Sequence, residues 1–378
     1  MPSICFVAGD PSGDAHAARL VDTLKAQRPE LSFTGLGGPS MERAGVTLLD
    51  DLTKAAAIGP FDAARHLGRF FRAKQLLQRQ FATTRPDLLI LVDFGDFNLP
   101  VIAPLAKRYH IPVLYYISPQ LWAWGRWRLR FVRRYVDRMV VFFPFEETFY
   151  RAAGVPVTWV GHPLVESATP SLTKEEALRR FGLNPWRRTV GLLPGSREQE
   201  IRRHLPLMVA SARRIAWRMP GVQFLLPKAP TIPRDRIMRD VLNAKMDVHV
   251  AEGSLRDALQ LMEAAIVVSG TATLEAALCG VPMVVIYRAS WPTYAAARLA
   301  VRLPHIAMVN VLAGRELVPE LLQHRATAER IASTMAELLR DDQRCEALRG
   351  QLRSVMQQLG PPGAVERASQ VVFEMLDG

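Results

Sequence analysis

Two α/β domains, each a doubly wound parallel sheet covered by helices, form the fold that this sequence predicts. Short apolar runs alternate with helix-like patterns along all 378 residues, which is typical of parallel sheets with helices on both faces. The runs 88–92 and 265–268 are apolar at every position, as expected of central strands buried on both faces. A chain of this length is too long for one ordinary core, which favours two domains.

The predicted elements follow in order along the two halves. In the first half, strands are predicted at 3–8, 31–36, 88–93, 112–117, 138–143 and 157–160. In the second half, they are predicted at 189–193, 222–226, 247–250, 265–268 and 283–287. Helices fill most of the gaps, and examples are 13–26, 65–82, 174–182, 201–218 and 271–279.

A polar segment separates the two halves. Residues 163–173 contain two prolines and end in a capping box formed by Thr173 and Glu176. We therefore predict an N-terminal domain over 1–168 and a C-terminal domain over 169–349. A Gly-Pro-Pro-Gly break at 360–363 precedes a last helix, and we expect the segment of about 350–378 to join the first domain.

The composition is that of a folded cytoplasmic protein. Hydrophobic residues make up 49% of the chain and charged residues 22%, which excludes a disordered chain. The three cysteines, Cys5, Cys279 and Cys345, have neither disulfide nor metal spacing, which fits a reducing compartment. No uncharged apolar run approaches the roughly 20 residues of a membrane span, and the first residues lack the features of a signal peptide.

The net charge of +12 leaves several partners open. An arginine-rich solvated surface, anionic membrane lipid, an anionic substrate and nucleic acid would each account for it. The chain has no zinc finger, basic zipper or aromatic RNA-binding strand, so nucleic acid is the least favoured partner.

Two turns in the second half are typical of anion binding. In 189–200 and in 265–275, a short apolar strand leads through small residues into a helix. Such turns can present unpaired N–H groups at the positive end of the helix dipole, and Arg197 adds donors that suit phosphate oxygens. The sequence thus predicts a diphosphate clamp formed by Gly195, Ser196, Arg197, Ser269, Gly270, Thr271 and Ala272. Glu275 would accept from a ribose hydroxyl, or would only meet the helix dipole.

Carboxylates follow two strands of the first half. Asp93 and Asp96 follow the buried run 88–92, and Asp10 and Asp14 follow the first strand. Ligands of parallel sheets bind at the carboxyl ends of strands, and partial burial there would raise the pKa of Asp93 towards that of a general base. The alternative is that Asp93, Asp96 and Asp14 cap helices while Asp10 is solvated.

Two segments of the first half favour contact with a lipid. Residues 60–81 form a basic amphipathic helix with Phe61, Leu67, Phe70 and Phe71 among its apolar residues. Residues 118–134 combine three tryptophans, Trp122 and Trp124 among them, with five arginines. The alternative for both segments is an ordinary core packed beneath a solvated charged surface.

Other enzyme classes receive no support. The chain has no Walker sequence, no metal-spaced cluster and no Gly-x-Ser-x-Gly turn, so no metal and no cofactor are predicted.

A set of motifs then identifies a family. They are Ser12-Gly13-Asp14, Gly38-Pro39-x-Met41, Asp93-x-x-Asp96-Phe97-Asn98, Ser118-Pro119-Gln120-x-Trp122-Ala123-Trp124, Phe143-Pro144-Phe145-Glu146, Gly161-His162, Leu193-Pro194-Gly195-Ser196-Arg197, 269–275 and Asn310-x-Leu312-Ala313-Gly314-Arg315-Glu316. Their number and order resemble the lipid-A-disaccharide synthase family, over essentially the whole chain. These are glycosyltransferases of the GT-B fold, with two facing Rossmann-like domains and a cleft between them.

The resemblance implies a reaction and its partners. UDP-2,3-diacylglucosamine would donate its sugar to the 6-hydroxyl of 2,3-diacylglucosamine 1-phosphate (lipid X). The products would be the β-1,6-linked lipid A disaccharide 1-phosphate, with inversion at the anomeric carbon, and UDP. The enzyme would act as a peripheral protein on the anionic cytoplasmic face of the inner membrane, without nucleic acid. No oligomeric state follows from the sequence.

The resemblance also implies roles for residues. Asp93 matches the proposed base, and Asp10 stands where the family usually has Glu, as Asp62 does before the amphipathic helix. Ser196, Arg197 and the 269–275 turn would hold UDP, with Asn310 nearby. Acceptor or membrane contact would involve Ser12, Asp96, Asn98, Trp122, Trp124 and the apolar residues of the 60–81 helix.

Two rival functions remain open on the sequence. One is another UDP-sugar enzyme of this fold, either a transferase for a different lipid-linked acceptor or a UDP-N-acetylglucosamine 2-epimerase. The epimerase is disfavoured because a soluble substrate has no need of a basic amphipathic helix. The other rival is a non-enzymatic protein that binds membrane surfaces or nucleic acid.

Overall fold

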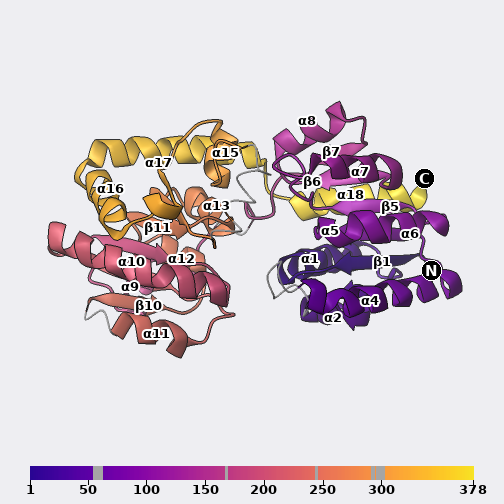
Figure 1. Cartoon of the computed structure of the whole chain (residues 1–378), viewed down its shortest axis with the longest axis horizontal. Helices are drawn as coiled ribbons and strands as arrows, with labels where there is room; N and C mark the ends of the chain where they lie inside the picture. Colours follow the sequence, from indigo (N-terminus) through magenta and orange to yellow (C-terminus); the bar gives the residue numbers. More distant parts are fainter. Residues whose placement is uncertain (54–62, 167–168, 243–245, 291–293, 295–302) are drawn as a thin grey trace. The chain divides into compact units, whose positions relative to one another are not determined.

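The computed structural model describes the chain except residues 54–62, 167–168, 243–245, 291–293 and 295–302, and the side chains of 63–67. It divides into two compact units, Met1–Pro163 with Leu359–Gly378, and Leu164–Gln358. Each unit is a parallel sheet covered by helices (Figure 1).

The unit bounds differ slightly from those expected from the sequence. Leu164 lies in the second unit, where its carbonyl oxygen accepts from Arg256 at 3.2 Å. Helix α17 (Asp342–Met356) also belongs there and contacts α13 (Thr271–Leu278), so residues 350–358 do not join the first domain. The chain leaves the second unit only at the Gly-Pro break, because the apolar face of α17 is already buried.

The first unit has a seven-stranded sheet with the order β3-β2-β1-β4-β5-β6-β7. Its strands are β1 (Ser3–Ala8), β2 (Ser32–Gly37), β3 (Thr47–Asp51), β4 (Leu88–Val92), β5 (Val113–Tyr116), β6 (Arg138–Val141) and β7 (Val157–Trp159). All neighbouring strands are parallel. Strand β3 was not predicted, because it is a half-buried edge strand that ends in two aspartates.

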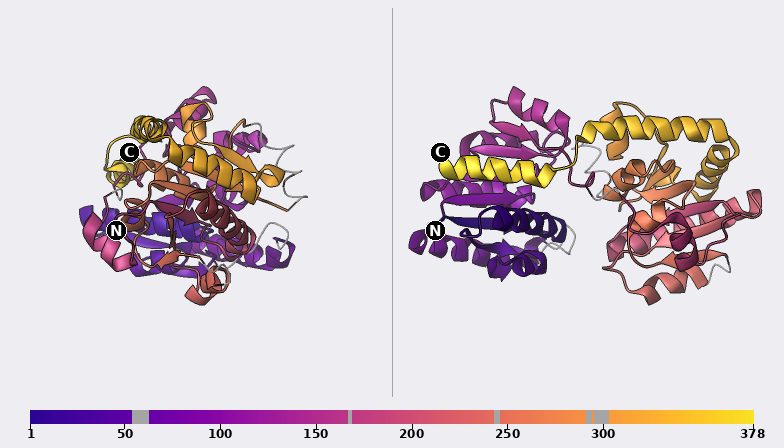
Figure 2. Two further views of the ribbon diagram at one scale, coloured as in Figure 1. Left: turned by 90° about the vertical axis from the view of Figure 1, so that its left-hand side faces the viewer. Right: turned by 180° about the vertical axis from the view of Figure 1, so that it is seen from behind.

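Helices cover both faces of this sheet. On one face, α1 (Pro11–Gln27) and α18 (Ala364–Asp377) share a core with the even-numbered residues of β1 and β4. On the other face lie α4 (Ala63–Thr83), α6 (Ala103–Arg108) and α7 (Leu129–Tyr135). Arg28 pairs with Asp377 through both guanidinium Nη atoms, which fastens α18 to α1. Figure 2 shows α18, in yellow, lying along the first unit.

The second unit has six parallel strands in the order β10-β9-β8-β11-β12-β13. They are β8 (Thr189–Leu193), β9 (Gln223–Pro227), β10 (Val248–Ala251), β11 (Ala264–Val268), β12 (Met283–Tyr287) and β13 (Glu320–Leu322). Strand β13 was missed because it has only three residues at an edge. Helix α10 (Glu198–Arg218) packs against α16 (Ala328–Arg340) over this sheet.

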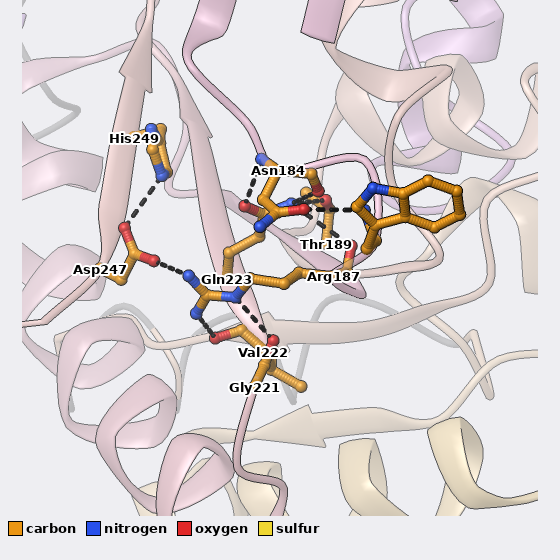
Figure 3. Close-up of polar contacts among 9 residues, drawn as sticks. Asn184, Arg187, Thr189, Gly221, Val222, Gln223, Asp247 and His249 are labelled. Atoms are coloured by element: carbon orange, nitrogen blue, oxygen red, sulfur yellow. Dashed lines mark hydrogen bonds and ion pairs between the residues drawn. The ribbon is translucent and has the colours of Figure 1, made fainter.

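A polar network fills the amino end of the second sheet (Figure 3). The buried Gln223 amide donates to the carbonyl oxygen of Asn184 at 2.8 Å and to the hydroxyl of Thr189 at 3.0 Å. Arg187 donates to the carbonyl oxygens of Gly221 and Val222 and pairs with Asp247. The polar side chains at this end of the sheet are therefore hydrogen-bonded to one another. The predicted ligand-binding residues lie at the opposite end, where the strands have their carboxyl ends.

Within the described residues, no helix is both long enough and apolar enough to cross a membrane.

Candidate functional site

The first sheet reverses its winding between the central strands β1 and β4. From β1 the chain moves outward to β2 and β3, and from β4 it moves the opposite way to β5, β6 and β7. Open parallel sheets bind ligands at the carboxyl ends of strands at such a switch point. Asp10 follows β1 and Asp93 follows β4, so both predicted residues lie at the switch point of the first unit.

The second sheet has its own switch point, between β8 and β11. The chain goes from β8 to β9 on one side, whereas β11 leads to β12 on the other. The Gly195–Arg197 turn follows β8 and the Ser269–Gly270 turn follows β11. The two predicted anion-binding turns therefore leave adjacent parallel strands at the same end of the sheet.

Asp93 has the electrostatics of a general base. The side chain is half-buried, and this burial raises the pKa of its carboxyl group to about 7. Repulsion by Asp10 and, less strongly, by Asp96 acts in the same direction. A carboxylate whose pKa lies near neutral accepts a proton readily, and a large fraction of it is still ionised near neutral pH.

Asp10 caps the helix for which Asp14 was considered, while Asp14 is buried rather than exposed to solvent. Asp10 is the N-cap of α1 and accepts from the N–H of Gly13 at 2.6 Å. Asp14 is 2% exposed and accepts from the N–H groups of Gly38, Ser40 and Met41 at 2.7–3.1 Å. Asp14 thus fastens α1 to the turn after β2, while Asp10 stays close enough to Asp93 to affect its pKa. Ser12 is exposed in the first turn of α1.

The loop after Asp93 separates Asp96 from Asn98. The Asp96 carboxylate is 73% exposed and pairs with Arg128, whose side chain is only 3% exposed. Asn98 is fully buried, and its amide donates to the carbonyl oxygen of Asp93 at 2.9 Å. The structure gives Asn98 a contact within the core, and its expected contact with an acceptor stays a prediction.

The two predicted tryptophans have different surroundings. The indole N–H of Trp122 donates to Glu146 at 3.1 Å. Burial raises the pKa of Glu146 to about 7. Trp124 is 39% exposed, and the Arg128 guanidinium lies 4.1 Å from its ring centroid. Sequence reasoning did not single out Arg128, since nothing in an arginine-rich segment marks which arginine is buried.

Helix α4 is partly a core helix and partly a surface helix. Ala73, Leu77 and Phe81 are buried in the core of the first unit. Phe70 packs against Phe97 with ring centroids 5.1 Å apart, while Phe71 is 61% exposed. Of the other apolar residues predicted here, Phe61 lies outside the described residues, as does the side chain of Leu67.

The turn after β8 is already capped by the chain. The N–H groups of Ser196 and Arg197 donate to one oxygen of Glu200, at 2.9 and 3.2 Å. The Arg197 guanidinium, 76% exposed, donates to the other oxygen at 3.1 Å. A side chain on Gly195, at φ +102°, would collide with Glu200. The prediction of open N–H groups is thus wrong for this turn, because the carboxylate three residues into α10 satisfies them.

The turn after β11 is open. Its N-cap residue, Gly270, has no side chain to cap α13, and among the described residues no atom beyond the two chain neighbours lies within 4 Å of the place a Cβ would occupy. The hydroxyl of Ser269 donates to the carbonyl oxygen of Ile306 at 3.2 Å, which fixes the turn from behind. Thr271 and Ala272 begin the helix, and burial raises the pKa of Glu275 in the same helix. As far as the described residues show, this is the turn of the two whose helix N-terminus stays open to an anion.

Asn310 has a structural role. Its amide nitrogen donates to Val318 at 2.8 Å and to Glu320 at 2.7 Å. Its amide oxygen accepts from the N–H groups of Leu317 and Val318. The side chain is fully buried and its amide is hydrogen-bonded through both oxygen and nitrogen, while its expected place near the nucleotide stays a prediction.

Across the described residues, no group of three or more His, Cys, Asp and Glu side chains is arranged to hold a metal ion.

The two parallel-sheet units define a class of protein by fold, that of the GT-B enzymes. The chain superposes on Staphylococcus aureus MnaA in complex with UDP with a TM-score of 0.68, covering 100% of this chain and 97% of that one at 11% identity. For the calicheamicin glycosyltransferase CalG4, the TM-score is 0.65, covering 100% and 98% at 15% identity. At these identities, both likenesses show the fold alone.

The sequence comparisons are more specific. The profile of the family described as lipid-A-disaccharide synthetase matches residues 4–374. Lipid-A-disaccharide synthases from Geobacter metallireducens and Nitrosococcus oceani are 45% and 41% identical to it, covering 99% and 100% of this chain and 97% of each relative. The chain therefore belongs to the lipid-A-disaccharide synthetase family, and it is a glycosyltransferase. The family match favours this reading over an epimerase or a non-enzymatic binding protein.

Proposed function

We propose that the chain transfers 2,3-diacylglucosamine from UDP-2,3-diacylglucosamine to the 6-hydroxyl of 2,3-diacylglucosamine 1-phosphate. The products are the β-1,6-linked lipid A disaccharide 1-phosphate and UDP. Membership of the family over nearly the whole chain supports this reaction. The single observation that carries the mechanism is the half-buried Asp93 at the first switch point, with its raised pKa.

Asp93 is the proposed general base. Its carboxylate accepts the proton of the acceptor 6-hydroxyl while the hydroxyl oxygen bonds to the anomeric carbon of the donor. The bond between that carbon and the diphosphate oxygen breaks, and its electron pair leaves with UDP. One displacement inverts the anomeric carbon, and Asp93 then returns its proton to solvent. General base catalysis of this kind contributes about 10²–10⁴-fold to a rate.

The leaving diphosphate needs positive charge, which the second switch point can supply. The open N-terminus of α13 presents a helix dipole to an anion, with Ser269, Gly270, Thr271 and Ala272 around it. Arg197 is exposed on the neighbouring turn and can reach for phosphate oxygens, although Glu200 also attracts it. We assign the donor nucleotide to these two turns, with Glu275 towards the ribose.

The acylated substrates support contact with a membrane, and we propose that the enzyme acts as a peripheral protein at the cytoplasmic face of the inner membrane. Phe71 and Trp127 are 61% and 59% exposed, and both come from segments that pack on the same face of the first sheet. Arg69 and Arg130 lie close to them in sequence and are also exposed. Exposed aromatics beside arginines suit an anionic headgroup layer, so we assign membrane contact to this surface.

The direct test is product formation. The chain is incubated with UDP-2,3-diacylglucosamine and 2,3-diacylglucosamine 1-phosphate, and the products are identified by mass spectrometry. We expect a disaccharide phosphate and one UDP per disaccharide. With UDP-N-acetylglucosamine alone, an epimerised sugar nucleotide would contradict the proposal.

The base is tested by Asp93→Asn. This variant should lose at least about a hundredfold in turnover, because it cannot accept the proton, while its affinity for UDP changes little. Asp22→Asn, at an exposed carboxylate of α1, is the matched control and should remain active. Near-normal turnover of Asp93→Asn would remove this residue from the role.

A further inference from the structure

The backbone at Asp93 has an unusual conformation. Asp93 and Phe94 have φ angles of +45° and +49°, so two successive residues with side chains occupy the left-handed region. This region is disfavoured for such residues because the Cβ approaches the backbone too closely. Conformations of this kind persist only where the surrounding structure enforces them, and they gather at functional sites.

Two buried side chains converge on the Asp93 carbonyl oxygen. The hydroxyl of Tyr115, on β5, donates to it at 2.5 Å, and the amide nitrogen of Asn98 donates at 2.9 Å. Burial raises the pKa of Tyr115 well above its usual range, so its hydroxyl stays protonated and remains a donor. The Asn98 amide also lies 3.4 Å from the carbonyl oxygens of Val7 and Val92, at the ends of the two central strands.

The next residue is held by packing. A Cβ on Gly9 would lie 2.2 Å from the ring of Phe94, so the ring fills the space that only glycine leaves open. Phe70 packs against the Phe94 ring from α4, with centroids 5.9 Å apart. Asn98 itself begins a π-helical turn, Asn98–Ile102, and such turns are frequent at functional sites.

The turn decides where the carboxylate of residue 93 goes. Side chains alternate along β4, and Leu89 and Leu91 lie in the core on the α4 face of the sheet. If the strand continued, residue 93 would point to the same face and into that core. The left-handed turn ends the strand instead and leaves the carboxylate half-buried at the switch point, beside Asp10.

We propose that Tyr115 and Asn98 are positioning residues, which hold the Asp93 peptide in its left-handed conformation and thereby fix the direction of the catalytic carboxylate. This inference rests on the proposed function of Asp93 as the base. This role requires no contact with substrate, and both side chains are fully buried. Rotation of the Asp93 peptide would break both hydrogen bonds at once, so the pair keeps the base oriented before substrate binds.

The test is Tyr115→Phe, which removes one hydroxyl and leaves the ring. We expect kcat to fall about tenfold to a hundredfold, since a small misplacement of a catalytic group has effects of this size. The KM for the donor should stay within about twofold, because the nucleotide binds in the other unit. A loosened Asp93 becomes better hydrated, so the acid limb of the kcat/KM profile should move to lower pH.

Tyr116→Phe is the matched control. It removes a buried tyrosine hydroxyl from the next residue of the same strand, on the opposite face of the sheet. We expect normal kcat and an unshifted pH profile for this variant. Asn98→Ala is the second variant and should reproduce the loss of kcat and the pH shift, which covers the case in which Tyr115→Phe does not fold.

Two outcomes overturn the inference. One is a Tyr115→Phe enzyme with the kcat and pH profile of Tyr116→Phe. The other is a loss of activity that follows thermal stability and leaves the acid limb unmoved. If Asp93→Asn is inactive in these cases, only the positioning role fails, whereas an active Asp93→Asn enzyme removes the base assignment itself.

Discussion

At the residue scale, the surroundings of an aspartate decide whether its carboxylate caps a helix or can act as a base. Asp10, Asp14 and Asp93 all follow strands in similar short polar segments, so the sequence alone does not show which of them has a structural role and which a catalytic one. The structure uses Asp10 to cap α1 and buries Asp14 among three backbone N–H groups. Asp93 combines partial burial with repulsion from the nearby Asp10 carboxylate, and this combination raises its pKa.

The raised pKa of Asp93 predicts the pH dependence of the reaction. The group must be ionised to act as a base, so kcat/KM should fall about tenfold per pH unit below its pKa of about 7. The folded chain also holds this proton over a pH range in which the unfolded chain has lost it. Stability should therefore decrease as the pH rises from about 4 to 7.

Rate profiles between pH 5 and pH 9 check the kinetic part, and thermal melts of the wild type and Asp93→Asn over the same range check the stability part. The Asn variant should gain relative stability as the pH rises. A kcat/KM that stays flat down to pH 5 would contradict the assignment.

At the element scale, two turns with the same sequence character have different structures. Both connect a central strand to a helix through small residues, and this common pattern was predicted. Whether a turn is open depends on the first residues of the helix behind it. Glu200 reaches back to the turn after β8, whereas Gly270 leaves the N-terminus of α13 uncapped.

A carboxylate introduced into the open turn should weaken UDP binding without lowering the stability of the fold. Asp at an N-cap accepts from N–H groups of the first turn, so Gly270→Asp should leave α13 as stable as before or slightly more stable. The same charge occupies the anion site and repels phosphate, so the affinity for UDP should fall about tenfold or more. Isothermal titration calorimetry with UDP measures this.

Gly270→Ala is the control for this prediction, because the open space at this position admits a methyl group without adding charge. It should bind UDP nearly as the wild type does. Equal affinities of the Asp and Ala variants would show that the diphosphate does not bind at this turn.

At the scale of the whole molecule, the net positive charge can be considered together with the positions of two exposed aromatic side chains, Phe71 and Trp127. The net charge of +12 left membrane lipid, substrate and nucleic acid open. Helix α4 has one face buried in the core and one exposed face, which carries Phe71. Trp127 is also exposed, and its segment packs on the same face of the sheet as α4. We therefore propose this surface of the first unit as the place of lipid contact.

Removing the aromatics from this surface should weaken membrane binding. The double variant Phe71→Ser and Trp127→Ser loses two exposed apolar side chains, so its binding to vesicles containing phosphatidylglycerol should fall about tenfold or more. Vesicle sedimentation at two salt concentrations measures the effect, and added salt should weaken the wild type as well. Trp186→Ser is the control, since Trp186 is 92% exposed in the second unit. Equal binding of the double variant and the wild type would contradict the assignment.

The sequence by itself determined the fold class, most strands, the family and the identity of Asp93 as the candidate base. These depend on local signals, because apolar periodicity, small-residue turns and ordered motifs are written in neighbouring residues. Only the tertiary structure decided that Asn98 and Asn310 are enclosed by the core, that Arg128 is the buried arginine of its segment, and that Tyr115 meets the Asp93 carbonyl oxygen. It also gave β3 and β13 their places as edge strands. Burial and pairing between distant residues arise from packing, and no local pattern along the chain encodes which partner a side chain will find.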